Sequence, residues 1–112
     1  MGNSKKINLK NKNISIIGMG ETGQGAALLA KKLGANVLIS DSKKITEKIF
    51  NQKACNMGIE VETGGHTNKI YNSDLWILSP GIPSNINIIK NAIDKGIKIV
   101  SEIEFASWFT TK

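Results

Sequence analysis

The 112-residue chain contains no arginine, one cysteine and one histidine, and it has few aromatic residues. Its net charge of +6 at neutral pH therefore comes from lysines alone, which are scattered along the sequence. Proteins that read nucleic-acid bases rely on clustered basic residues and on arginine in particular, so the composition argues against a nucleic-acid partner. A lysine-rich surface also favours anionic small molecules.

Other absences narrow the function further. The single cysteine, Cys55, cannot form an intrachain disulfide, which suits a reducing cytoplasm, and we expect it to be a buried structural thiol. No segment is long and apolar enough to cross a bilayer, so we expect no membrane partner. The only histidine, His66, lies in a glycine-rich loop and is expected to form hydrogen bonds there. Because no Walker A motif, no nucleophile with a base and no cluster of metal ligands is present, we expect neither catalytic residues nor a cofactor in this domain.

The most informative pattern is a short apolar strand, Asn13–Ile17, followed directly by the sequence GMGETG. This is the G-x-G-x-x-G pattern of a strand–turn–helix unit that binds a diphosphate. Gly18 permits the tight turn, Gly20 allows close approach to the ligand, and Gly23 allows the helix to lie close to the strand. The N-terminus of that helix offers free N–H groups and a partial positive charge to an anion.

Strand and helix patterns alternate along the rest of the chain. The expected strands are residues 14–17, 36–40, 59–62, 75–78 and 98–100. The expected helices are residues 22–33, 45–57 with Met57 on its apolar face, 84–95 with Ile93 on its apolar face, and a last helix opened by a capping box of Ser101 and Glu104. The alternation predicts an α/β fold: a Rossmann-like, doubly wound, five-stranded parallel sheet in a single domain, with strand order 3-2-1-4-5.

That strand order brings three distant features to one edge of the sheet. The glycine turn and the loop Ser79–Gly81 face each other across the switch point, and Asp41 follows the second strand beside them. Asp41 stands where a carboxylate accepts hydrogen bonds from a ribose or a base, or it is a solvated turn residue. The Thr22 hydroxyl contacts a phosphate or caps the first helix. The residues alone leave three classes open: a nucleotide or nucleotide-sugar domain, a stand-alone NAD-binding dehydrogenase or regulatory domain, and an interaction domain without a ligand.

Taken in order, the glycine turn, Asp41, the sequence SPGI at 79–82 and the sequence SEIE at 101–104 resemble the N-terminal domain of the Mur ligases. The resemblance covers residues 13–108. Within the family, Thr22 in the glycine turn is most similar to the members that join D-glutamate to UDP-N-acetylmuramoyl-L-alanine in peptidoglycan synthesis. The resemblance implies that the domain holds the UDP part of this substrate instead of NAD.

The resemblance also implies which residues bind. The diphosphate would lie at the glycine turn, the uracil after the second strand, and the crevice wall after the fourth, which assigns substrate binding to Gly20, Glu21, Thr22, Gly23, Asp41, Ser42, Lys43, Ser79, Pro80 and Gly81.

In the family, ATP and Mg²⁺ bind to a central and a C-terminal domain. We therefore expect residues 1–12 to be a flexible lead-in or tag remnant and 13–105 to be the UDP-binding domain. Residues 106–112 would end the last helix or begin a linker to an ATP-binding domain that this chain does not contain. On this interpretation the parent protein is a cytoplasmic, ATP-dependent, amide-forming ligase, and the 112-residue chain alone is inactive.

Overall fold

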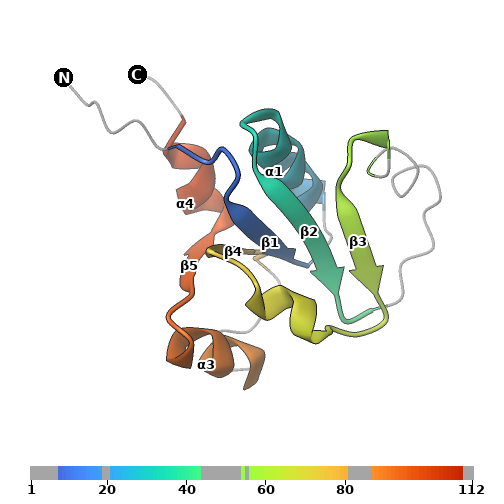
Figure 1. Ribbon diagram of the computed structural model, residues 1–112, viewed down its shortest axis with the longest axis vertical. Helices are drawn as coiled ribbons and strands as arrows, with labels where there is room; N and C mark the ends of the chain where they lie inside the picture. Colours follow the sequence, from blue (N-terminus) through green and yellow to red (C-terminus); the bar gives the residue numbers. More distant parts are fainter. Residues whose placement is uncertain (1–7, 19–20, 44–53, 55, 81–86, 110–112) are drawn as a thin grey trace.

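The computed structural model describes residues 8–18, 21–43, 54, 56–80 and 87–109, with the side chains of residues 21–23 left aside (Figure 1). The described residues form one parallel sheet with the order β3-β2-β1-β4-β5. Its strands are β1 (Asn13–Ile17), β2 (Asn36–Asp41), β3 (Glu60–Thr63), β4 (Leu75–Leu78) and β5 (Lys98–Ser101). The predicted α/β fold class and strand order are both confirmed.

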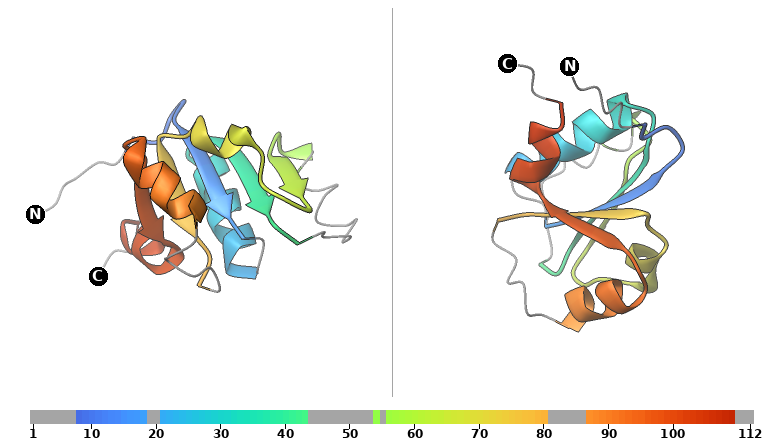
Figure 2. Two further views of the ribbon diagram at one scale, coloured as in Figure 1. Left: turned by 90° about the horizontal axis from the view of Figure 1, so that it is seen from below. Right: turned by 90° about the vertical axis from the view of Figure 1, so that its left-hand side faces the viewer.

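Helices cover both faces of this sheet. Helices α1 (Glu21–Lys32) and α4 (Glu102–Ser107) lie on one face, and α3 (Asn87–Asp94) with the 3₁₀ helix η1 (Asn68–Tyr71) lies on the other (Figure 2). This two-sided cover is the doubly wound arrangement that right-handed crossovers produce. None of the helices in the described ranges has the length and apolar character needed to span a membrane.

The face under α1 and α4 is apolar throughout. Every second residue of the central strands points to it, including Ile16, Ile39 and Ile77, none of which is measurably exposed. Helix α1 meets these side chains with Ala26, Ala27 and Ala30. Small side chains let a helix axis approach a sheet closely.

The opposite face combines an apolar half with a polar half. Trp76 is fully buried there against Ile70 and Ile89, and its indole Nε1–H donates to the carbonyl of Ile70 at 2.6 Å. Two serines on the same face, Ser15 and Ser40, are also buried. Because a buried polar group needs a partner, the contacts of these serines define the polar half.

The structure corrects the sequence-based picture at two positions, Met57 and Ile93. Both were expected on apolar helix faces, but Met57 is 36% exposed and Ile93 is 62% exposed. The buried positions against the sheet are taken by nearby residues such as Ala54 and Ala92. Most of the second expected helix lies outside the described residues, as do Cys55 and the start of the third. In the segment that precedes β1, Leu9 is 6% exposed and its neighbours 8 and 10–12 are exposed, and the Asn11 amide donates to the Gly34 carbonyl at 2.9 Å.

Glycines mark the ends of helices, and a sequence prediction holds at the start of α4. Gly34, Gly58 and Gly96 all have positive φ, which is the backbone conformation expected of a residue that stops a helix. The Ser101 hydroxyl accepts the Glu104 amide at 3.0 Å, as the first half of a capping box requires. That bond fixes where α4 begins at the end of β5.

Candidate functional site

The carboxyl ends of β1, β2 and β4 lie side by side. Ile17 is in register with Ser40 on one side and with Leu78 on the other. The Gly18 amide donates to the Ser40 carbonyl at 2.8 Å, and the Ser79 amide donates to the Ile17 carbonyl at 3.0 Å. Gly18 has φ of 100°, so it is the turn residue that the glycine pattern predicted. The structure thus brings the beginnings of the three predicted loops together.

The predicted binding residues are described to different extents. Gly20 and Gly81 lie outside the described residues. Glu21, Thr22 and Gly23 form the first turn of α1, and only their backbone is described. Ser79 is half-buried and Pro80 is exposed. At the level of the backbone, the described ones among these positions converge at one edge of the sheet; their contacts with a ligand stay predictions.

The loop after β2 is held in a defined turn. The Asp41 carboxylate accepts the Lys43 amide at 2.8 Å, which is an Asx turn. Ser42 and Lys43 are exposed, whereas Asp41 is half-buried. The Asp41 carboxylate is therefore fixed at the edge of the sheet, and the Lys43 ammonium extends from a turn whose backbone is set.

A second loop, after β3, supports the first. The Gly64 amide donates to the Lys43 carbonyl at 3.0 Å, and the Gly65 amide donates to the Asp41 carbonyl at 3.3 Å. Gly64 and Gly65 have φ of 80° and 144°, a region that favours glycine. The paired glycines let this loop turn its amides towards the carbonyls of the Asp41 turn.

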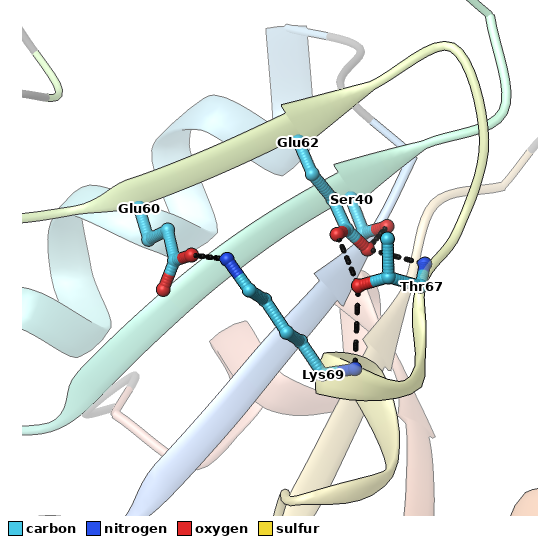
Figure 3. Close-up of polar contacts among 5 residues, drawn as sticks. All are labelled: Ser40, Glu60, Glu62, Thr67 and Lys69. Carbon is cyan, nitrogen blue, oxygen red and sulfur yellow. Dashed lines mark hydrogen bonds and ion pairs between the residues drawn. The ribbon is translucent and has the colours of Figure 1, made fainter.

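Next to this turn lies a cluster of four polar side chains, Ser40, Glu62, His66 and Thr67, called the Glu62 network below. Figure 3 shows three of them, Ser40, Glu62 and Thr67. The Glu62 carboxylate accepts the Ser40 hydroxyl at 2.5 Å, the Thr67 hydroxyl at 2.6 Å and the Thr67 amide at 3.0 Å. The Ser40 hydroxyl oxygen is also 2.7 Å from Nδ1 of His66. The expectation that His66 forms hydrogen bonds in its loop is confirmed.

Hydrogen bonds keep the Glu62 carboxylate charged. Partial burial raises the pKa of Glu62, but the hydrogen bonds from Ser40 and Thr67 and the nearby His66 ring together lower that pKa below its ordinary value of 4.5. At neutral pH the network therefore contains a carboxylate that accepts hydrogen bonds and donates none.

Sequence reasoning missed the roles of Ser40, Glu62 and Thr67. A signal was available: Ser40 interrupts the apolar run of β2, and it is in register with Glu62 on β3. A buried polar residue opposite a carboxylate on the neighbouring strand indicates a hydrogen bond between them. Reading this signal requires the register of the two strands, which the sequence leaves open.

The geometry suits binding better than bond cleavage. Backbone amides, a positive helix terminus and an exposed lysine gather at one edge, and such groups hold an anionic ligand. Among the residues that the structure describes, no three His, Cys, Asp or Glu side chains are grouped so as to hold a metal ion. Fold and edge together define a doubly wound α/β domain with a candidate nucleotide site at its switch point.

Comparison with known proteins specifies the family. Residues 12–101 match the family of the Mur ligase MurD-like N-terminal domain. The chain is 47% identical over 100 residues to the UDP-N-acetylmuramoylalanine–D-glutamate ligase of Christiangramia forsetii, and 38% identical over 99 residues to the ligase of the same name from Staphylococcus epidermidis; each match covers 88% of this chain and 22% of the relative. A pseudomurein peptide ligase type C from Methanothermus fervidus superposes with a TM-score of 0.76 at 25% identity, over 91% of this chain and 21% of that one.

The chain therefore belongs to the family of MurD-like N-terminal domains of Mur ligases. The resemblance drawn from the sequence is confirmed. The chain spans about a fifth of the length of the curated relatives it matches.

Proposed function

We propose that the chain holds the UDP part of UDP-N-acetylmuramoyl-L-alanine, as the N-terminal domain of an ATP-dependent ligase that joins D-glutamate to this substrate. The observation that carries the proposal is the meeting of the glycine turn, the Asp41 turn and the Ser79 loop at the switch point of a MurD-like N-terminal domain. The names of the relatives support the choice of substrate.

Each part of the edge has a role in this proposal. The amides at the start of α1 hold the diphosphate, because a helix N-terminus combines free N–H donors with a partial positive charge. The Asp41 carboxylate accepts hydrogen bonds from the nucleoside, and Ser42 and Lys43 lie beside it. Ser79, Pro80 and Gly81 form the opposite wall. ATP and Mg²⁺ are assigned to the remainder of the ligase, and no step of the amide-forming reaction is assigned to residues of this chain.

The division of the chain follows the same proposal. We assign residues 13–105 to the UDP-binding domain. We assign residues 106–112 to the end of the last helix or the start of a linker to the ATP-binding part of the ligase. The 112-residue chain is then expected to bind substrate without ligating it. Formation of the D-glutamyl product by this chain alone, with ATP, Mg²⁺ and substrate, would contradict the assignment.

The binding test is a titration followed by backbone amide NMR. UDP-N-acetylmuramoyl-L-alanine, UDP and NAD are added separately. The two UDP ligands are expected to shift the amides of 18–23, 41–43 and 79–81, and to leave those of Asn13 and Asn36 at the amino ends of the strands unchanged. Shifts with NAD alone would replace the proposal with a dinucleotide-binding domain, and no shift with any ligand would overturn it for the isolated chain.

A matched pair of variants tests the role assigned to Asp41. In Asp41→Asn the side-chain oxygen that accepts the Lys43 amide is kept and the negative charge is lost. Because hydrogen bonds to a charged acceptor are about twice as strong as neutral ones, we expect UDP to bind roughly tenfold more weakly. Asp94→Asn, which changes an exposed carboxylate at the end of α3, is the control and should bind as the unmodified chain does.

A further inference from the structure

The Glu62 network lies next to the proposed uracil end of the site. None of its residues is among the residues assigned to substrate binding. Ser40 immediately precedes Asp41 and is fully buried. Its carbonyl accepts the Gly18 amide, and its hydroxyl contacts both Glu62 and His66. One residue thus connects the glycine turn, the Asp41 turn and the loop after β3.

The protons of this network can be assigned by counting donors. An ionised carboxylate only accepts, so the single hydroxyl proton of Ser40 is used in its bond to Glu62. The Ser40 oxygen must then accept from His66, which places a proton on Nδ1 of that ring. The result is a directed chain: His66 donates to Ser40, and Ser40 donates to Glu62.

Thr67 completes the carboxylate's contacts from the other side. Its hydroxyl and its amide both donate to Glu62, and the same hydroxyl oxygen accepts the Lys69 amide at 3.3 Å. That last bond caps the N-terminus of η1. Glu62 therefore joins β2, the loop after β3 and η1. Gly64 and Gly65, which lie between Glu62 and Thr67 in the sequence, donate the amides that hold the Asp41 turn.

We infer that Glu62 and His66 are positioning residues for the Asp41 turn, acting through Ser40 and the Gly64–Gly65 amides to hold the segment that receives the uridine end of the substrate. This inference rests on the proposed function for its ligand. The first part of the inference, that the network fixes the conformation of the Asp41 turn, can be tested without any ligand.

Two glutamates on one strand supply the matched test. Glu62→Gln keeps the size of the side chain and removes the charge that orders the donors around it. Glu60→Gln makes the same change two positions earlier, where the carboxylate pairs with the exposed Lys69 ammonium. We expect Glu62→Gln to weaken UDP binding about tenfold and to shift the free amides of 41–43, since hydrogen bonds to charged groups are the stronger class, while Glu60→Gln changes neither.

His66 allows a rescue experiment. His66→Ala removes the donor to Ser40 and is expected to weaken UDP binding. His66→Asn places a side-chain N–H donor near the position of Nδ1 and is expected to restore most of the affinity. Thermal melting first establishes that both variants are folded equally well. If the ring had a merely structural role, the two variants would then bind UDP with the same affinity. If Glu62→Gln fails to fold, this pair carries the test.

A spectroscopic measurement without ligand tests the direction of the hydrogen bonds from His66 to Ser40 to Glu62. Long-range ¹H–¹⁵N spectra of the neutral ring should show the proton on Nδ1 of His66 in the unmodified chain and in Glu60→Gln, and a change of this preference in Ser40→Ala. A proton on Nε2 in the unmodified chain would overturn the inference. So would unchanged 41–43 amides and unchanged affinity in Glu62→Gln. If the unmodified chain binds no UDP, the proposed function fails, and the free amide shifts and the tautomer still decide whether the network positions the turn.

Discussion

Glu60 and Glu62 lie two positions apart on β3 and point to the same face of the sheet, yet their surroundings differ (Figure 3). Glu60, at the amino end of the strand, pairs with Lys69, and both side chains are more than half exposed. Glu62, at the carboxyl end, accepts three hydrogen bonds from Ser40 and Thr67 and is only partly exposed. One strand thus carries a solvated ion pair at one end and an ordered carboxylate at the other.

The two buried serines repeat this contrast on the neighbouring strands. Ser15, in the middle of β1, contacts the hydroxyl of Ser73, which precedes β4, at 2.6 Å, and Ser73 donates to the carbonyl of Ile70. That chain of bonds is neutral throughout, whereas the one through Ser40 ends on a charge. The hydrogen-bond chain through Ser40 therefore contains the stronger, charge-assisted class of bond, and it lies at the carboxyl edge where the candidate site is placed.

The largest effect is expected from truncating the two serines. Ser40→Ala leaves a charged carboxylate short of one donor, and we expect a loss of about 2 kcal/mol in the free energy of unfolding. Ser15→Ala breaks a neutral bond and should cost about 1 kcal/mol. Urea denaturation of both variants measures the difference. Equal losses would remove the distinction between the neutral chain of hydrogen bonds and the one that ends on a charge.

A smaller effect is expected from pH. The pKa of Glu62 is lower in the folded chain than its ordinary value of 4.5, so its contribution to stability is complete above that value and is lost as pH falls below it through the folded pKa. Stability curves of the unmodified chain and of Glu62→Gln should therefore converge in acid. Other carboxylates titrate in the same range, and the difference between the two curves isolates Glu62. Parallel curves would mean that this carboxylate is not specially stabilised.

The smallest effect is expected at the amino end. The Lys69–Glu60 pair is exposed, and exposed pairs contribute little because water and salt screen them. Glu60→Gln should leave the free energy of unfolding unchanged within the error of the measurement, at low and at moderate salt. A clear, salt-dependent loss would show that this end is also electrostatically ordered.

The sequence predicts the fold well, because the deciding signals are local. Apolar runs such as Ile14–Ile17, helix stops such as Gly34 and the Ser101 cap act within a few residues, and the right-handed crossover rule then leaves few strand orders. The meeting of Gly18, Asp41 and Ser79 follows from that order alone. The ligand contacts of these loops stay predictions.

What the sequence did not predict depends on tertiary register. The pairing of Ser40 with Glu62 requires the alignment of β2 and β3, and the 3₁₀ helix η1 forms where Thr67 caps it. The exposure of Ile93 is set by how α3 rotates against the sheet. Local patterns specify which element forms, whereas these details depend on how the elements dock.

The position of β1 at the centre of the sheet also has a kinetic consequence. On one side Ile14 pairs with Val37, but on the other it pairs with Leu75, much farther along the chain. Closing that loop, roughly three times as long as those joining β1 to β2 and β4 to β5, costs about 1 kcal/mol more in chain entropy. Parallel pairings between distant segments fold slowly, so β1 and β4 are expected to join late. Since Gly18 and Ser79 meet only through that pairing, the two walls of the candidate site come together in one of the last steps of folding.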